Sequence, residues 1–403
     1  MSEPSALAVL SRPDLRRWIL ARLFAGIAIT SVRATVLWQV YDITKSTALL
    51  GLLGLLSFIP APFAALSGGV AADAYDRRKI VLVAQGVGIV CAAAFVGLNS
   101  LDRPHLGWFY LLFVINGAAL AFEAPSRASM LPRLVPPEEL GRAVTVMSTV
   151  QALSFVSGPA MAGLLIGASG PRLPCIVAVV LLAISLALVV GVREQQRVTT
   201  KPAVGLKAVR EGLAYVLKNR VVLGALSIDL FAVLFGGATA MLPVYASDIL
   251  HVGAHGYGIL AAALDVGAVA TSIALVFLPP IRRLGRAIVI SVLVYGMATI
   301  AFGLSRTFPM ALCAYVMVGI ADQVSVVSRS TLVQISTPDE LRGRVSSVSM
   351  VFILASNQLS VAESGFVAAM TTPQFSVVAG GIMVFAVSAV IAIVVPQLWR
   401  YER

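Results

Sequence analysis

The sequence predicts an all-α membrane protein in which twelve transmembrane helices form two six-helix halves related by a pseudo-twofold axis. Three observations predict this fold class. The chain of 403 residues is 59% hydrophobic and only 12% charged, whereas soluble domains average about 25% charged residues. Apolar stretches of about 20 residues, long enough to cross a bilayer as helices, recur along the whole chain. The hydrophilic stretches between them alternate between basic and nearly uncharged.

The apolar stretches define the elements in order. The expected spans cover residues 18–41, 48–72, 80–99, 107–128, 143–168, 173–193, 220–246, 255–278, 287–305, 308–330, 345–369 and 373–396. The first is too long for the core of a signal peptide, and no small-residue cleavage site follows it. We therefore interpret it as a span rather than a leader.

The distribution of basic residues predicts the topology. If the N-terminus is cytoplasmic, the cytoplasmic stretches hold clusters such as Arg77, Arg78 and Lys79. The opposite side then keeps only isolated cations, namely Lys45, Arg103, Arg172 and Arg306. This is the positive-inside bias, and it places both termini in the cytoplasm.

The net charge of +11 is explained by this orientation and by contact with anionic membrane lipids. A nucleic-acid-binding protein would need its basic residues on one soluble face, and no soluble domain remains. Cys91, Cys175 and Cys313 stand singly in or beside different spans, so neither disulfides nor a metal site is expected. The sequence predicts no cofactor.

A long hydrophilic stretch and an internal repeat divide the chain. We expect an N-terminal half over residues 1–193, a cytoplasmic linker over 194–219 and a C-terminal half over 220–403. The segment "SRASMLPRLVPPEELGRAV" from Ser126 is answered by "SRSTLVQISTPDELRGRV" from Ser328. Repeats about an axis along the membrane normal are a known architecture of secondary transporters.

Over nearly its full length the chain resembles the major facilitator superfamily, in particular its bacterial efflux branch of enterobactin-exporter-like permeases. The segment "GGVAADAYDRRK" resembles the family's signature between helices 2 and 3, carried by Gly69, Asp73, Arg77 and Arg78. One departure is Ala74, where the pattern has arginine. The segments "LWQVYDITKST", "FEAPSRASMLPRLVPPEEL" and "SNQLSVAESG" carry the narrower resemblance.

The resemblance implies a gating role for this charged loop. In the family, its aspartate helps to latch the two halves on the cytoplasmic side. Here Asp73 with Arg77 would form a state-dependent latch, and Asp73 or Asp76 would face the N-terminus of the span that starts near Ser346. A solvated loop that only sets topology is the alternative interpretation.

Ionisable residues inside spans are costly and therefore indicate a functional interior. The resemblance places helices 1, 4, 7 and 10 around the central cavity. The candidate substrate and proton residues are Arg33, Asn116, Glu123, Arg127, Asp229, Asp265, Tyr315, Asp322, Arg329 and Glu363. Glu123 is expected to mirror Asp322, and Arg127 to mirror Arg329. A fixed ion pair that only joins helices is the alternative for each.

The segment "SGPAMAG" partly resembles the family's antiporter signature through Gly158, Pro159 and Gly163. Ser154 and Ala162 depart from it, and close helix packing explains the motif equally well. No histidine lies within a span, so carboxylates would carry the protons.

The expected function is secondary active export of an amphipathic small molecule, siderophore-like or drug-like, by proton antiport and alternating access, with one chain acting alone. No ATP-binding G-x-x-x-x-G-K-[ST] loop is present. Uptake of an organic solute or movement of a lipid is the alternative within the fold. An intramembrane enzyme built on "GASG" at Gly167–Gly170 is disfavoured, because no intramembrane histidine could serve as the base.

Overall fold

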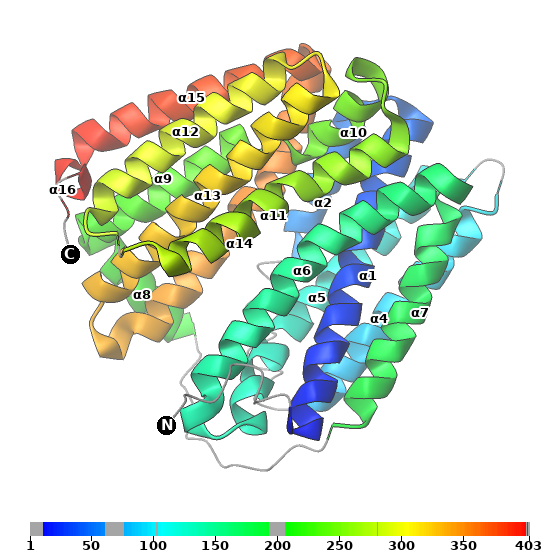
Figure 1. The fold of residues 1–403 in the computed structure, drawn as a ribbon, viewed down its shortest axis with the longest axis horizontal. Coiled ribbons are helices and arrows are strands. Elements are labelled where there is room, and N and C mark those ends of the chain that lie inside the picture. Colours follow the sequence, from blue (N-terminus) through cyan, green and yellow to red (C-terminus); the bar gives the residue numbers. More distant parts are fainter. Residues whose placement is uncertain are drawn as a thin grey trace. The chain divides into compact units, whose positions relative to one another are not determined.

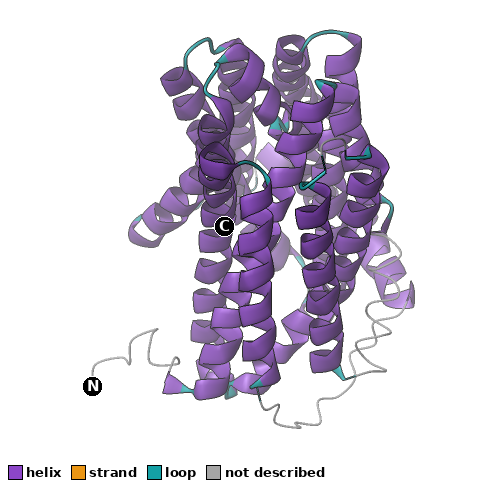
Figure 2. Ribbon diagram, turned by 90° about the vertical axis from the view of Figure 1, so that its right-hand side faces the viewer, coloured by secondary structure: helices purple, strands orange, loops and turns teal. Residues whose placement is uncertain are grey.

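The fold was examined in a computed structural model that describes residues 11–60, 76–101, 104–192, 206–279, 281–399 and 401. Over these residues the chain is almost entirely α-helical and contains no strand (Figure 2). Eleven of the described helices are long and apolar enough to cross a membrane. The remaining expected span, 48–72, is described only as far as residue 60. This described part contains the apolar helix α2 (Thr47–Phe58). The predicted fold class is confirmed.

The chain divides into two compact units. Unit 1 comprises Met1–Gln39 and Ile59–Val204, and unit 2 comprises Val40–Phe58 and Gly205–Arg403. This division differs from the expected sequence halves at Val40–Phe58, because α2 packs along a helix of unit 2.

The described residues of unit 1 form five long helices, the first of which ends in unit 2 (Figure 1). They are α1 (Pro13–Thr44), α4 (Arg77–Leu98), α5 (Leu106–Leu134), α6 (Pro137–Ser169) and α7 (Arg172–Val190). Within the unit α4 packs against both α5 and α7. An apolar cluster that includes Leu15, Trp18, Val81 and Met130, all fully buried, joins α1, α4 and α5. These helices bury their contacts with one another and leave the rest of their apolar surface exposed.

Unit 2 contains α2 and the elements that follow residue 205 (Figure 1). They are α8 (Leu206–Lys218), α9 (Arg220–Gly236), the 3-10 turn η2 (Thr239–Met241), α10 (Leu242–Val244), the π-helical turn η3 (Tyr245–Ile249), α11 (Gly253–Phe277), α12 (Leu284–Leu304), α13 (Phe308–Ser336), the 3-10 turn η4 (Asp339–Leu341), α14 (Arg342–Met370), α15 (Pro373–Val394) and α16 (Pro396–Trp399). Helix α13 packs against α11 and α12, and α12 also packs against α15. Helix α14 packs against α2 and α9, with Gly51, Gly54 and Gly365 allowing α2 to approach closely.

The second part of the expected linker forms the amphipathic helix α8, which packs against α14 and α9 of unit 2. Glu211 of α8 forms an ion pair with Arg344 of α14, and the Tyr215 hydroxyl donates a hydrogen bond to the carbonyl oxygen of Ser336. The side chain of Asn219 then caps α9 by accepting from the amides of Val221 and Val222. The second part of the linker is therefore a fixed structural element of unit 2.

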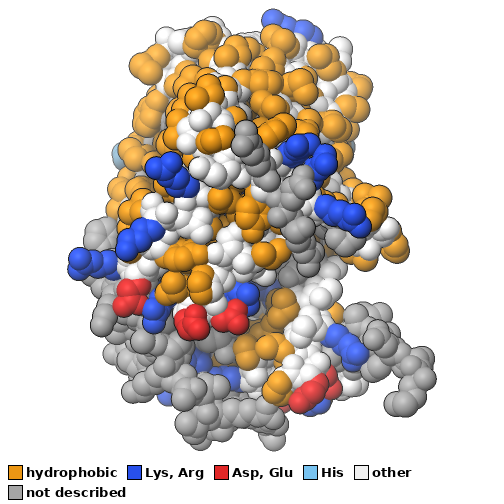
Figure 3. All heavy atoms as spheres, turned by 90° about the vertical axis from the view of Figure 1, so that its left-hand side faces the viewer, with side chains coloured by type: hydrophobic (Ala, Val, Ile, Leu, Met, Phe, Trp, Pro, Cys, Tyr) orange, Lys and Arg blue, Asp and Glu red, His pale blue; other side chains and the backbone are white. Residues whose placement is uncertain are grey.

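The surface composition fits a membrane-embedded protein. Large apolar side chains such as Phe277, at 83% exposure, and Ile393, at 78%, face outward. Hydrophobic side chains cover much of the face in Figure 3, and the acidic side chains visible there gather toward its lower part. In water such exposed apolar area would be unfavourable, whereas a hydrocarbon environment accommodates it.

Candidate functional site

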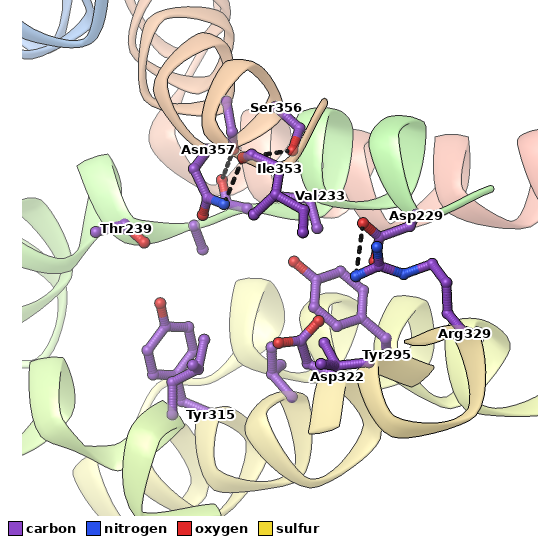
Figure 4. A pocket seen from close by; sticks show the side chains of 16 residues that line it. Asp229, Val233, Thr239, Tyr295, Tyr315, Asp322, Arg329, Ile353, Ser356 and Asn357 are labelled. Atoms are coloured by element: carbon purple, nitrogen blue, oxygen red, sulfur yellow. Dashed lines mark hydrogen bonds and ion pairs between the residues drawn. The ribbon is translucent and has the colours of Figure 1, made fainter. Parts of the chain in front are cut away.

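A polar cavity of about 130 Å³ lies inside unit 2. Its polar lining residues come from several helices and from the turn after α9 (Figure 4). They are Asp229, Thr239, Tyr295, Tyr315, Asp322, Arg329, Ser356, Asn357 and Ser360. A group of this polarity inside an otherwise apolar bundle indicates a binding or transport site, because buried polar groups are retained in membrane helices chiefly for function.

An ion pair between two helices forms one wall of the cavity. Arg329 of α13 lies 3.1 Å from the carboxylate of Asp229 on α9, and both residues are 5% exposed. The pair neutralises two charges that would each be very unfavourable alone in this environment. The Nε atom of Arg329 has no hydrogen-bond partner within the described part of the chain. Arg329 therefore keeps one donor that its carboxylate partner does not satisfy.

Asp322 is the second acid of the cavity and lies two turns before Arg329 on α13. Among the described residues it makes no hydrogen bond and no ion pair, in contrast to Asp229. In Figure 4 its carboxylate lies beside the ring of Tyr295. A smaller space of about 10 Å³ adjoins Asp229, Asp322 and Ser325, roughly the volume that one water molecule requires. Asp322 is thus a half-buried acid of the cavity that forms no ion pair among the described residues.

The helix that carries Asp229 is interrupted at the cavity. Helix α9 ends at Gly236, and the chain passes through Gly237 before η2 begins at Thr239. Hydroxyl groups satisfy the released carbonyls: Thr299 donates to the oxygen of Gly236 at 3.4 Å, and Ser360 donates to that of Gly237 at 3.3 Å. A Cβ atom at Gly237 would lie 2.0 Å from the Ser360 hydroxyl, so a larger residue does not fit here. Interrupted helices with such satisfied backbone groups occur in membranes where they line a cavity.

Unit 1 contains a different buried charge pair. Arg127 and Glu123 form an ion pair one turn apart on α5, and both side chains are buried. The guanidinium of Arg127 also lies 5.4 Å from the centre of the Trp18 ring, a cation–π geometry. Nearby on α1, Arg22 donates a hydrogen bond to Gln151 at 2.9 Å. The Glu123–Arg127 pair is thus local to one helix, and the ring of Trp18 lies against its arginine.

The family is decided by sequence comparison. The sequence profile of the Major Facilitator Superfamily matches residues 18–361. The chain belongs to this superfamily. It is therefore a multi-pass membrane transporter and not an enzyme.

Among curated proteins, this facilitator is similar to the enterobactin exporter EntS of Shigella boydii serotype 4 (strain Sb227), with 25% identity over 396 residues, covering 98% of this chain and 94% of the relative. The same identity and coverage hold for enterobactin exporter EntS of Escherichia coli O1:K1 / APEC. Full-length coverage means that the resemblance includes both units.

Solved structures of other transporters share the fold. A POT family transporter in complex with a thioalcohol conjugated peptide superposes with a TM-score of 0.74 at 14% identity, covering 95% of this chain and 96% of that one. The nucleoside transporter NupG superposes with a TM-score of 0.68 at 16% identity, covering 96% of this chain and all (100%) of that one. At these identities the similarity concerns the fold alone.

The facilitator brings four of the predicted cavity residues together. Asp229, Tyr315, Asp322 and Arg329 line the same space in unit 2. Glu123 and Arg127 form the buried pair of unit 1, and Asn116 lies half-buried on the same helix, with its side-chain oxygen near Gly88 of α4.

Three other predicted residues do not line the cavity. Arg33 is exposed on α1, and Asp265 on α11 and Glu363 on α14 are half-buried without lining the cavity. The Oε2 atom of Glu363 is buried and has no hydrogen-bond partner among the residues described.

The expected mirror relation holds for the arginines but not for the acids. Ser126–Arg127 and Ser328–Arg329 are buried at matching places in the repeat. Glu123, however, pairs with its own arginine, whereas Arg329 pairs with Asp229 and leaves Asp322 aside. The spacing explains this difference: Glu123 is one turn from Arg127, and Asp322 is two turns from Arg329.

Tyr295 and Thr239 line the cavity and were not predicted. Tyr295 lies in an expected span without any charged residue, so only its isolated hydroxyl distinguished it from a packing residue. Thr239 follows a Gly-Gly pair and precedes Pro243, a combination that signals a helix break.

Part of the predicted gating loop lies outside the described residues, namely Gly69 and Asp73. Asp76 caps its own helix α4 by accepting from the amide of Arg78 at 2.9 Å. This side chain therefore serves as the N-cap of its own first turn. The expectation that Asp76 faces the start of another span stays a prediction. The guanidinium of Arg78 donates to the carbonyls of Val189 and Val190 at the end of α7, where a cation is favourable. Arg77 lies in the first turn of α4.

The antiporter-like motif serves close packing between α6 and α1. A Cβ atom at Gly158 would lie 1.9 Å from the Thr30 hydroxyl, and Thr30 donates to the carbonyl of Ser154 at 3.0 Å. Pro159 lies within the continuous helix α6, and Gly163 is buried. In this facilitator the motif therefore has at least a structural role.

Among the described residues no group of three or more His, Cys, Asp or Glu side chains is arranged to hold a metal ion.

Proposed function

We propose that this facilitator exports an amphipathic small molecule, siderophore-like or drug-like, across the bacterial cytoplasmic membrane in exchange for protons, as a single chain with both termini in the cytoplasm. The observation that carries the proposal is Asp322, an acid that has no ion-pair partner in the described part of the chain and lines a cavity that already contains a complete ion pair. An acid in this position can accept and release a proton, whereas Asp229 is held by Arg329.

The surroundings of Asp322 support a role in proton exchange. The ionisable groups near it are Asp229 on α9, Asp265 on α11, Tyr295 on α12, and Tyr315 and Arg329 on α13. A nearby arginine favours the carboxylate, and nearby acids together with burial favour the protonated form. Any change in the distance between Arg329 and Asp322 during transport would therefore change the proton affinity of Asp322.

The direction and the substrate class are supported by the curated relatives, which are named as enterobactin exporters. At 25% identity this supports efflux of an amphipathic compound rather than one particular siderophore. The alternation of basic and nearly uncharged loops supports the proposed orientation.

The proposal is tested in inverted membrane vesicles that are acidified inside by respiration and report their pH gradient through a quenched acridine dye. A panel of amphipathic compounds, including a catechol siderophore and hydrophobic dyes, is added one at a time. A transported compound should partly restore the fluorescence, because protons leave the vesicle as the compound enters. The variant Asp322→Asn should lose this response, and the matched surface variant Asp339→Asn should keep it.

Two outcomes would contradict the proposal. An unchanged response in Asp322→Asn would remove this residue from proton exchange. Compound movement that is unchanged when the proton gradient is collapsed would indicate transport driven by the compound's own gradient.

A further inference from the structure

We propose that the cavity of unit 2 is a binding subsite for the positively charged nitrogen of a monovalent amphipathic cation. The inference names the substrate class of the proposed exporter and rests on that function for its role in transport. Binding itself is a property of the cavity and can be measured without transport.

The first argument is the charge of the lining. Asp229, Asp322 and Arg329 are its only Asp, Glu, Lys, Arg or His members among the described residues, so the lining has two carboxylates against one guanidinium. The Arg329 guanidinium forms its ion pair with Asp229 at 3.1 Å and acts on Asp322 only as a more distant charge. One negative charge of the lining therefore stays unbalanced when both acids are ionised. A charge in such a low-dielectric place requires a counter-charge, which is either a proton on the acid or a bound cation.

The second argument is the aromatic lining. Tyr295 is 6% exposed and Tyr315 is 2% exposed, and both line the space next to Asp322 (Figure 4). Tyr315 packs against Phe302 at 5.0 Å between ring centres, and Phe302 stacks on Tyr245 at 4.6 Å. These contacts hold the Tyr315 ring in place. Aromatic rings beside an acid are the surroundings in which proteins bind alkylammonium groups, through the cation–π interaction.

The third argument is size. An apolar cavity of about 150 Å³ holds one benzene molecule, so a cavity of about 130 Å³ accommodates a head group but not a whole amphipathic compound. Asn357 lines the cavity and is also exposed, so we infer that the cavity opens on the side of this residue. The apolar part of the ligand would leave the cavity there.

The same features disfavour anionic ligands. A carboxylate or sulfonate would meet the like charge of Asp322, and the cation that could bind it, Arg329, already binds Asp229. Binding an anion would therefore require Asp322 to be protonated and the interhelical ion pair to open.

The test compares three ligands of equal chain length on the full-length protein in lipid nanodiscs near neutral pH. They are octyltrimethylammonium, octyldimethylamine oxide, which has no net charge, and octanesulfonate. Equilibrium binding is measured by calorimetry for the wild type, Asp322→Asn, Asp322→Glu and the surface control Asp339→Asn. The neutral ligand also reports whether each variant retains a folded site.

The cation should bind at least about tenfold more tightly than either other ligand, as expected for one uncompensated charge at short range. Asp322→Asn should lower the affinity for the cation by about tenfold and leave the affinity for the amine oxide unchanged. Asp322→Glu and Asp339→Asn should retain the preference for the cation. Equal binding of the cation and the amine oxide by the wild type would overturn the inference, as would an unchanged ratio in Asp322→Asn.

The two proposals fail separately. A preference for the cation without any proton exchange in vesicles would support the cation subsite and contradict proton-coupled export. Proton exchange driven by a neutral compound, with no preference for the cation in nanodiscs, would support proton-coupled export and contradict the cation subsite.

Discussion

Arg127 in unit 1 and Arg329 in unit 2 each follow a buried serine in the repeated segment of the sequence, yet their charges are neutralised differently. Arg127 is paired within its own helix by Glu123 and lies over Trp18. Arg329 is paired across helices by Asp229, in a cavity that contains the further acid Asp322. The comparison teaches that a duplicated motif can retain its arginine while, among the described residues, only the copy in unit 2 lies in a cavity with a second acid outside the ion pair.

The largest expected effect on stability follows from removing each arginine. Arg329→Gln leaves Asp229 and Asp322 without a cation, and breaking a buried pair costs about 3–5 kcal/mol. Arg127→Gln leaves only Glu123 and should therefore destabilise the protein less. Thermal unfolding in detergent, followed by tryptophan fluorescence, measures both.

The double variant Asp229→Asn/Arg329→Gln serves as the control, because it removes both members of the ion pair and leaves Asp322 as the one acid of the lining. It should recover most of the loss of the single variant. An equal loss of stability in Arg127→Gln and Arg329→Gln would show that the additional acid Asp322 does not increase the cost of removing Arg329.

A second and smaller effect is expected at the interruption of α9. Gly237→Ala places a methyl group 2.0 Å from the Ser360 hydroxyl, and overpacking of this kind costs about 1–3 kcal/mol. The variant Gly237→Ala/Ser360→Ala should regain part of that stability in the same unfolding measurement. No regain would mean that the neighbouring carbonyl of Val233, 2.9 Å from the added atom, sets the cost instead.

The smallest effects are expected at the exposed ion pairs, Arg12–Glu139 in unit 1 and Glu211–Arg344 in unit 2. Their side chains are 30–43% exposed, and such pairs contribute about 1 kcal/mol or less. Arg12→Ala and Arg344→Ala should each shift the unfolding midpoint only slightly, and high salt should reduce the shift further. A loss as large as that of Arg329→Gln would contradict the ranking of buried over exposed pairs.

The spans could be predicted from the sequence because hydropathy and length are local properties. Apart from 220–246, every expected range lying wholly within described residues corresponds to one helix. The Glu123–Arg127 pair is also local, since residues four apart share a helix face. The ion-pair partner of Arg329 could not be predicted from such local spacing. It depends on how α9 and α13 are rotated and packed, which one sequence does not specify.

The interruption of the expected span 220–246 shows a further limit of prediction from the sequence. Hydropathy continues without a break through Gly236 and Gly237, so the run was interpreted as one helix over 220–246. The Gly-Gly pair followed by Pro243 signals a break, but where it lies relative to a cavity is a tertiary property. Tyr295 was missed for a related reason, because one hydroxyl in an apolar span is more often a packing feature.

The early end of α9 also has an electrostatic consequence. Aligned peptide units give the C-terminus of a helix a partial charge of about −0.5, and α9 places that end at Gly236, beside the cavity, instead of at the membrane surface. This field comes from the backbone, so it does not titrate and survives any side-chain replacement. Some attraction for positive ligands should consequently remain even when every acid lining the cavity has been neutralised.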